Sequence, residues 1–337
     1  MDIDVNRLRR DFLISASTAP VFRPDRAPQP PADYACAIAI GAFDGVHRGH
    51  RELLGATVRD ARKRGIAAVA VTFDPDPDCV VTDHSAPKLM APRDRIAALA
   101  ASGVDAVLVI PFNEDIAALD HEGFFRHVIL PLLDVRSIHV GADFRLGRGG
   151  ASTVEVIRAW GEGAGIAVHG HELLCSGGEP ITATRIRGLL ARGDLDEAAS
   201  ELGRRYFVRG TVRAGRGEGS KMGFPTANIG LPRYIQRPAP GVYAGFALDG
   251  TTAWPAAINV GVPPTFAHEK GAAELEANFL GFDGDLYDED ISILFCRLLR
   301  EQRKFDSLDE LIAAVKGNIE DVRNLFGDKQ VNLGVDF

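Results

Sequence analysis

The stretch AIAIGAFDGVHRGHREL, residues 37–53, decides the fold class of the first half of the chain. It opens with an apolar run of strand length, passes through a turn that contains glycine, and continues as a helix expected to begin near His47. A buried strand followed at once by a helix is typical of parallel α/β sheets. The stretch also places His47 and His50 on one face of that helix, because residues three apart are neighbours there.

Similar strand-like runs alternate with helical patterns from residue 35 to about residue 188. The expected helices cover residues 48–64, 92–101, 121–133 and 153–163. Apolar runs without strict alternation, separated by helix-length crossovers, predict a doubly wound α/β domain with a parallel sheet covered on both faces. Ligands of such domains bind at the carboxyl ends of the strands. The runs are ACAIAIGAF, AAVAVTF, VDAVLVIPF, SIHVGADF and IAVHGHELL.

The pattern changes after residue 204 to short strand candidates separated by Gly and Pro, which predicts a small antiparallel β-barrel. An amphipathic helix over residues 307–326 is expected to close the chain, with Leu308, Leu311, Ile312 and Val315 on its inner face. The strand candidates are YFVRGTVRAG, FPTANIGL, GVYAGFAL, TAWPAAINVG, LEANFLGF and DISILFCRLL.

The length of 337 residues favours two domains over one. The charged, proline-rich beginning has no apolar core of a secretory signal, so residues 1–34 are expected to form a flexible arm. We therefore predict a doubly wound α/β domain over residues 35–190, a linker region over 191–204 and a barrel domain over 205–330.

Composition excludes several classes of protein. With 46% hydrophobic and 25% charged residues the chain is globular, and its longest apolar runs are too short for a membrane helix. A net charge of -8 disfavours binding to nucleic acid. Four scattered cysteines lack the spacing of a zinc site or a disulfide framework, which favours a cytoplasmic location. The sequence does not specify an oligomeric state.

The histidine turn is a candidate phosphate site. The first amides of a helix lack internal partners and carry the positive end of the helix dipole, so they favour an anion. His47 and His50 could donate hydrogen bonds to the oxygens of a reacting phosphate. In the alternative interpretation Asp44 caps the helix and the histidines have no chemical role. A metal pair is less well supported, because histidine ligands on a helix are more usual at i and i+4.

A second stretch, ITATRIRGLL at residues 181–190, follows the last strand of the α/β domain and also begins a helix. Thr182 and Thr184 supply hydroxyl groups, and Arg185 and Arg187 supply guanidinium groups suited to phosphate oxygens. By itself this pattern is most often a solvated helix cap. Together with the histidine turn at one edge of the sheet, it predicts a triphosphate site.

The barrel half contains GRGEGSKMGFPTAN, residues 215–228. Its glycines allow a backbone to approach phosphates closely, although the spacing is not that of a P-loop and a glycine-rich hairpin is the alternative. Thr226 and Asn228 share one face of an extended segment and offer oxygen ligands suited to Mg²⁺ beside ATP. The glycines considered for phosphate binding are Gly215, Gly217 and Gly219.

At this point the chain resembles a known family. GAFDGVHRGH and ITATRIR resemble the H-x-G-H and I-S-S-T-x-x-R signatures of nucleotidyltransferases. VTFDPDP, FRLG and an unaltered GFPTAN resemble the prokaryotic bifunctional riboflavin kinase/FAD synthetase family in particular, over residues 36 to about 326. The resemblance implies that the barrel converts riboflavin and ATP to FMN, and that the α/β domain converts FMN and ATP to FAD and pyrophosphate, both with Mg²⁺.

The resemblance also implies roles for residues of the first site. His47 and His50 would stabilise the α-phosphate of ATP while the phosphate of FMN attacks it. Asp143 would lie in the site. The remaining implied residues are Gly41 and Phe43, which bind ATP, and Thr184, Arg185 and Arg187, which hold the departing pyrophosphate, with Arg185 counted as catalytic.

In the barrel, the resemblance implies that Thr226 and Asn228 bind Mg²⁺ and the phosphates of ATP. Glu276, in AELEANFLGFDGDLY, would be the general base that takes the proton of the ribityl hydroxyl. Glu274 lies two residues earlier on the same strand face and competes for that role. A glutamate on a strand is otherwise most often a solvated surface residue.

Three positions depart from the family pattern. The family usually has serine where this chain has Thr182 and Ala183, and often histidine where it has Asp76, an anion expected near bound phosphates. The alternative function is therefore a paralogue with an active kinase domain and an adenylyltransferase domain that is inactive or changed in its nucleotide or flavin specificity. A third interpretation is a flavin- or nucleotide-binding sensor, which the retained Glu276 and GFPTAN disfavour.

Overall fold

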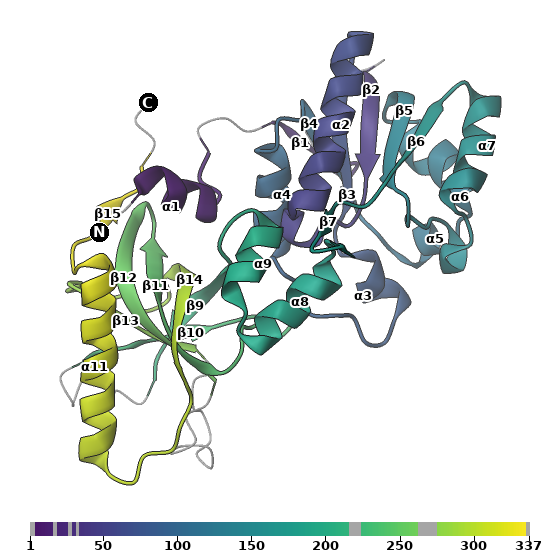
Figure 1. Cartoon of the computed structure of the whole chain (residues 1–337). Helices are drawn as coiled ribbons and strands as arrows, with labels where there is room; N and C mark the ends of the chain where they lie inside the picture. Colours follow the sequence, from purple (N-terminus) through teal and green to yellow (C-terminus); the bar gives the residue numbers. More distant parts are fainter. Residues whose placement is uncertain are drawn as a thin grey trace. The chain divides into compact units, whose positions relative to one another are not determined.

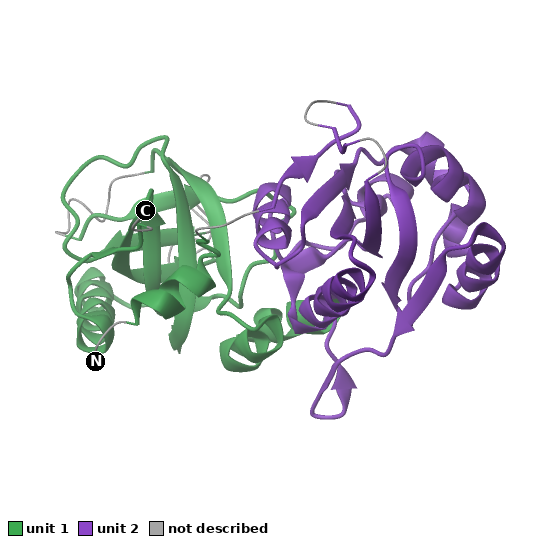
Figure 2. Ribbon diagram, turned by 90° about the horizontal axis from the view of Figure 1, so that it is seen from above, with its two compact units in different colours: residues 1–16, 184–337 green, residues 17–183 purple. Residues whose placement is uncertain are grey.

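The computed structural model describes residues 4–15, 19–25, 29–31, 34–215, 224–261 and 275–334. The chain divides into two compact units (Figure 2). Ser17–Ala183 forms one unit, called the sheet unit below. Met1–Ala16 and Thr184–Phe337 together form the other, called the barrel unit.

The sheet unit contains a six-stranded parallel sheet in the order β1-β4-β3-β2-β5-β6. The residues of β4 are all buried, and those of β2 and β3 nearly all, because helices lie on both faces of the sheet (Figure 1). This confirms the predicted doubly wound α/β domain. The strands are β1 Val21–Phe22, β2 Ala35–Ile40, β3 Ala67–Phe73, β4 Ala106–Ile110, β5 Asp134–Gly141 and β6 Ala167–His171.

The helices of the sheet unit lie close to their predicted positions. The main departure is at residues 121–133, where a short α-helix passes into a π-helix, η2, at Phe125–Ile129. The helices are η1 Asp44–Val46, α2 Arg48–Arg64, α3 Pro77–Val81, α4 Pro92–Ala100, α5 Glu114–Ala117, α6 His121–Phe124, η3 Arg148–Gly150 and α7 Val154–Ala164. A small hairpin, β7 Cys175–Ser176 with β8 Glu179–Pro180, follows β6.

The strand order reverses between β2 and β5. From β2 the chain builds outward through β3 and β4, and it then returns to place β5 and β6 on the other side of β2. At such a reversal the connections leave in opposite directions, which opens a crevice outside the carboxyl ends of the strands. The turn after β2, which carries His47, lies at this position.

The barrel unit is antiparallel and closed. Its sheet runs β11-β14-β9-β10-β13-β12-β15, and an additional pairing of β11 with β12 closes six of these strands into a barrel. This confirms the predicted barrel. Its strands are β9 Phe207–Arg213, β10 Ala227–Gly230, β11 Gly241–Asp249, β12 Thr252–Val260, β13 Leu275–Phe279, β14 Asp290–Glu301 and β15 Val331–Asn332.

The closing helix α11 spans Leu308–Phe326 and lies along the barrel (Figure 1). Its predicted inner face was wrong at Leu308, whereas Leu311, Ile312 and Val315 are half-buried. Leu308 is 59% exposed, whereas Val322 is fully buried against Ala244 and Leu280. The helix packs chiefly through its second half, so its first turn does not contribute a core residue.

The stretch predicted to be a flexible arm is folded where it is described. Helix α1, Val5–Asp11, is capped by Asp4 and buries Leu8, and Phe12 follows it into the same core. Both side chains pack in a cluster with Phe207 and Phe246 of the barrel unit. Strand β1 in turn extends the parallel sheet by pairing with β4. The expectation of a flexible arm was wrong here, because Leu8 and Phe12 complete the core of the barrel unit and Phe22 of β1 completes that of the sheet unit.

The predicted linker is also folded. Helix α8, Ala183–Arg192, is followed by α9, Leu195–Leu202, which begins at the capping residue Asp194. Leu195 and Leu202 are buried. The end of α8 and the whole of α9 therefore lie within residues 191–204, which were predicted to be a linker region.

Candidate active sites

The turn after β2 holds its backbone in unusual conformations. Phe43 and Val46 have φ values of 54° and 42°, in the left-handed region that residues with a Cβ rarely adopt. Such conformations concentrate at functional sites, where the surrounding fold enforces them. The Phe43 ring is buried and covers Gly41, where a Cβ would lie 3.3 Å from that ring. The turn thus brings the chain into α2 with His47 at its entrance.

His47 is the N-cap of α2, and its Nδ1 accepts a long hydrogen bond of 3.4 Å from the backbone N–H of His50. The two imidazole rings stack with their centroids 3.6 Å apart. Asp44 instead accepts a hydrogen bond from the backbone N–H of Leu89 at 2.8 Å. The alternative in which Asp44 caps the helix is therefore wrong.

The environment keeps His50 neutral. Burial, followed by the neighbouring His47 and Arg95, holds the pKa of His50 well below its usual value. Its Nδ1 is enclosed and has no hydrogen-bond partner among the described residues. A neutral imidazole can still donate one N–H, which is what an oxygen of a reacting phosphate requires.

A cavity of about 720 Å³ opens at the carboxyl end of the sheet. This size is within the range of small-molecule sites, which is about 300–1,000 Å³. Its wall includes the ends of β2, β3, β5 and β6, as expected for the crevice of a doubly wound sheet. Of the residues predicted for the first site, it is lined by Gly41, Phe43, His47, His50 and Asp143.

The second predicted stretch reaches this cavity only at its beginning. Thr182 and Ala183 line the wall. The next residues begin α8, where the guanidinium of Arg187 donates to the Thr184 hydroxyl at 2.9 Å. Arg185 forms ion pairs at 2.6 Å with Glu197 and with Glu201 on α9; this involvement of Arg185 was not foreseen from the sequence.

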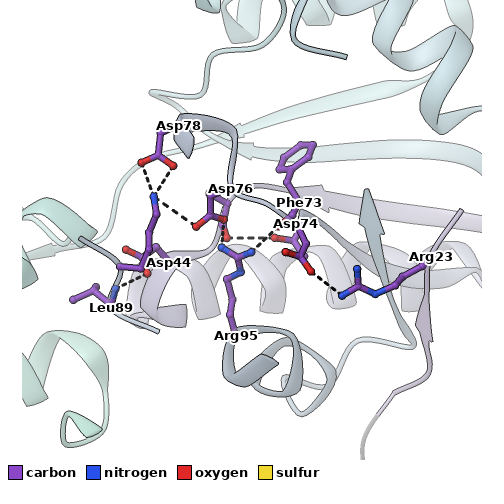
Figure 3. Close-up of polar contacts among 11 residues, drawn as sticks. Arg23, Asp44, Phe73, Asp74, Asp76, Asp78, Leu89 and Arg95 are labelled. Atoms are coloured by element: carbon purple, nitrogen blue, oxygen red, sulfur yellow. Dashed lines mark hydrogen bonds and ion pairs between the residues drawn. The ribbon is translucent and has the colours of Figure 1, made fainter. Parts of the chain in front are cut away.

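Asp76 does not present an uncompensated charge to the cavity. Its carboxylate pairs with Arg95 and lies 3.6 Å from the ammonium of Lys88, which also contacts Asp78 (Figure 3). Arg95 additionally donates to the backbone carbonyl of Phe73 at 2.6 Å. Asp76 and Arg95 are almost fully buried. The aspartate at this position is therefore neutralised by two cations within the fold.

The sequence analysis did not single out His171, which lines the same cavity at the end of β6. His139 lies beside it, with its Nδ1 2.9 Å from His171 Nε2. Burial lowers the pKa of His139 to about 4, against the opposing effect of the hydrogen bond that it donates to Asp60. The sequence could have indicated His171 through its position at a strand end, because the carboxyl ends of β5 and β6 border the predicted crevice.

In the barrel unit, strand register assembles the second candidate site. Asn228 on β10 lies directly opposite Glu276 on β13, and Glu276 in turn lies opposite Asn259 on β12. Arg213 on β9 lies opposite Asn228 on its other side. Directly opposite residues project from the same face, so four polar side chains form a row across four strands. Arg213 and Asn259 were not assigned from the sequence.

Thr226 and Asn228 line a pocket of about 180 Å³ beside this row, together with Tyr287 and other residues after β13. Gly215 lies against Asn228, and a Cβ at that glycine would collide with the Asn228 amide. A side chain at this position would therefore displace the Asn228 amide. The predicted residues Gly217, Gly219 and Glu274 lie outside the described residues.

Comparisons with known proteins cover both units. Residues 29–185 match the family model of FAD synthetase, and residues 202–326 match that of riboflavin kinase. These matches fall on the strands and turns that build the two candidate sites.

Several bifunctional riboflavin kinase/FMN adenylyltransferases are similar along nearly their whole length. The protein of Pseudomonas fluorescens is 34% identical over 88% of this chain and 94% of its own. The Escherichia coli K12 protein is 35% identical over 87% and 93%, and the Bacillus subtilis protein is 32% identical over 86% and 92%.

A crystal structure described as a macrolide-efflux protein from Streptococcus pneumoniae is also similar, with a TM-score of 0.77 and 27% identity. The match covers 90% of this chain and 99% of that one. Within the described ranges of the present chain, no helix is long and apolar enough to cross a bilayer.

Proposed function

The chain belongs to the family of bifunctional riboflavin kinase/FMN adenylyltransferases, and we propose how its two units divide the work. The enzyme phosphorylates riboflavin with ATP to give FMN and ADP. It also transfers the adenylyl group of a second ATP to FMN, which gives FAD and pyrophosphate. We assign the first reaction to the barrel, and the second to the sheet unit together with the first turn of α8, which begins at Ala183.

In the sheet unit, the cavity of about 720 Å³ would hold ATP with its α-phosphate at the entrance of α2. A phosphate oxygen of FMN attacks the α-phosphorus, and the bond to the bridging oxygen of the β-phosphate breaks. His47 and His50 would donate N–H groups to the α-phosphate oxygens, and the positive end of the α2 dipole would add to this stabilisation. Gly41, Phe43 and Asp143 would border the nucleotide.

The departing pyrophosphate would be held at the start of α8. Arg187 and Thr184 are already joined by a hydrogen bond, which orders both groups on the first turn. The two ion pairs of Arg185 orient its guanidinium, so it would act on the pyrophosphate from a preset position. The neutralised charge of Asp76 supports an active adenylyltransferase over the inactive paralogue.

In the barrel unit, Glu276 would take the proton of the ribityl hydroxyl as its oxygen attacks the γ-phosphorus of ATP, and ADP leaves. Thr226 and Asn228 would hold Mg²⁺, because their hard oxygen donors beside a pocket leave coordination positions for phosphates and water. When bound, the ion neutralises phosphate charge. Gly215, with Gly217 and Gly219, would let the backbone approach the phosphates.

The observation that carries the proposal is the register that sets Glu276 opposite Asn228, in a unit separate from the histidine cavity. Chromatography of the products formed from riboflavin, Mg²⁺ and ATP should detect FMN and then FAD. With FMN supplied, ATP should give a dinucleotide and CTP and GTP much less. A chain that yields FMN but no dinucleotide with any nucleotide would contradict the role of the sheet unit. The cytoplasmic location stays a prediction.

A further inference from the structure

Three histidines and an aspartate gather under α2 in the sheet unit. His139 on β5 pairs in register with His169 on β6, and His171 follows on the same strand face. The His139 ring stacks on both, with centroids 4.8 Å from His169 and 5.1 Å from His171. Asp60 of α2 completes the group, with its Oδ2 3.2 Å from His139 Nε2. These four residues are called the histidine cluster below.

The ligand atoms of the cluster lie at distances that suit one metal ion. Asp60, His139 and His169 each offer a donor atom, and these atoms lie within 4.8 Å of one another. Two ligands about 2.0–2.1 Å from a tetrahedral ion are about 3.3 Å apart, close to the 3.2 Å between Asp60 Oδ2 and His139 Nε2. His169 Nε2 is enclosed and has no hydrogen-bond partner among the described residues. Its lone pair is a third available ligand.

Neighbouring groups orient these ligands, as they do in metal sites generally. The Ser137 hydroxyl donates to Asp60 Oδ2 at 2.6 Å, and Arg64 Nε donates to the same carboxylate at 2.9 Å. His139 uses its other ring nitrogen towards His171. His139 is 3% exposed, whereas His169 is partly exposed.

We propose that Asp60, His139 and His169 form a binding site for one divalent ion of the Zn²⁺ class. Two imidazole nitrogens and one carboxylate oxygen suit such an ion, whereas Mg²⁺ prefers oxygen ligands. Three protein ligands leave a fourth position for water. The site is distinct from the Mg²⁺ position proposed in the barrel unit, and it does not depend on the reaction assigned to the cavity.

Metal binding would change the wall of the cavity through His171. Without metal, the Asp60 carboxylate accepts the Nε2 proton of His139, so His139 Nδ1 must accept the Nε2 proton of His171. A metal needs the lone pair of His139 Nε2. The His139 proton then lies on Nδ1 and is donated to His171 Nε2, so the proton of His171 moves to its Nδ1. Each ring keeps one proton, and the bond between the rings reverses.

The test uses the full chain, stripped with a chelator and dialysed against Zn²⁺ in excess Mg²⁺, with bound zinc measured by mass spectrometry. We expect one Zn²⁺ per chain and a weakening of at least about 10-fold in His169→Ala, because a lost ligand costs no less than a lost orienting partner. Since His169 is partly exposed, this variant should fold. The matched control, His127→Ala, changes an exposed histidine elsewhere in the unit and should bind as the unaltered chain does.

Two further measurements keep the outcome clear. Co²⁺ in the unaltered chain should give the intense visible bands of a tetrahedral site, and these should be absent in His169→Ala. Nitrogen chemical shifts of His171 should exchange between Nδ1 and Nε2 when Zn²⁺ is added. Absence of stoichiometric zinc, equal affinity in His169→Ala, or loss of zinc binding in His47→Ala/His50→Ala would overturn the proposal, the last because it places the ion at the stacked pair.

Discussion

The sheet unit and the barrel unit place their reactive groups by different physical means. In the sheet unit, one short turn with left-handed Phe43 and Val46 carries both histidines, so the site depends on local backbone geometry at a strand end. In the barrel unit, Asn228 and Glu276 are 48 residues apart and meet only because β10 pairs with β13 in one register. A local site tolerates change elsewhere in its unit, whereas a register site depends on the whole pairing.

The comparison between the two units predicts the largest loss of activity for a substitution of Glu276. Glu276→Gln should lower the rate of FMN formation by up to about 10⁴-fold, because general-base catalysis contributes about 10²–10⁴-fold. ATP binding and the conversion of supplied FMN to FAD should be nearly unchanged. Steady-state assays of each half reaction measure this.

The control is Glu320→Gln, the same change at an exposed position of α11. Phosphorylation at the original rate in Glu276→Gln would remove this residue as the base, and Glu274 would be tested next.

Replacing Asp76 tests whether the sheet unit tolerates a buried cation without its ion-pair partner. Asp76→Asn should destabilise that unit by about 3–5 kcal/mol, because it leaves the buried cation Arg95 without its carboxylate partner, whereas Lys88 keeps Asp78. The chain has two tryptophans, Trp160 in the sheet unit and Trp254 in the barrel unit. In a Trp254→Phe background, urea unfolding followed by Trp160 fluorescence reports the sheet unit.

The surface pair of Glu122 and Arg126 provides the control, since Glu122→Gln should cost less than about 1 kcal/mol. Equal midpoints for the Asp76 and Glu122 variants would mean that the buried network does not stabilise the unit.

Substitutions in the histidine turn should slow the other half reaction, the one that Glu276→Gln leaves nearly unchanged. His47→Ala/His50→Ala should slow FAD formation by about 10²–10³-fold, the cost of losing donors to a developing oxyanion. Riboflavin phosphorylation should be unaffected. His84→Ala, at an exposed position of the same unit, is the control and should retain both activities. A parallel loss of kinase activity would contradict the claim that the two sites act independently.

Lowering the pH should destabilise the sheet unit more than the barrel unit, with a smaller effect than the substitutions above. Eight of the nine histidines belong to the sheet unit. Because burial lowers the pKa of His139 to about 4, the unfolded chain binds its proton first, and stability falls as the pH drops from about 6.5 to 4. The shift is worth about 3 kcal/mol in metal-free protein.

Urea midpoints of the Trp160 reporter across this pH range, with chelator present, measure the effect. His139→Gln should reduce the dependence in part, because the lowered pKa values of His50 and His171 still contribute to it. An unchanged slope in that variant would assign the acid sensitivity to other groups.

Sequence alone predicted both folds, because strand and helix patterns are local. Helix 48–64 was predicted at its observed bounds, and GFPTAN and the H-x-G-H-like turn located both candidate sites. The partners of Asp76 could not be found this way, since pairing with Arg95 and Lys88 depends on how α4 and the segment before it pack against the start of α3. The row of Arg213, Asn228, Glu276 and Asn259 likewise depends on strand register.

The errors have a common cause. Leu308 belongs to an amphipathic stripe, but a stripe does not say which turns of a helix reach the core. Residues 1–34 are polar on average, yet Leu8 and Phe12 are enough to dock α1. Short apolar sets that fill a gap in another element's core leave little signal in composition.

Mixing the two single-site variants tests the central claim of separate active sites most directly. Glu276→Gln and His47→Ala/His50→Ala are each given riboflavin, ATP and Mg²⁺, alone and combined, and FAD is followed by chromatography. The account predicts little FAD from either variant alone and restored FAD from the mixture, since FMN made by one is adenylylated by the other. A mixture that forms no FAD, although each variant retains its expected half reaction, would contradict it.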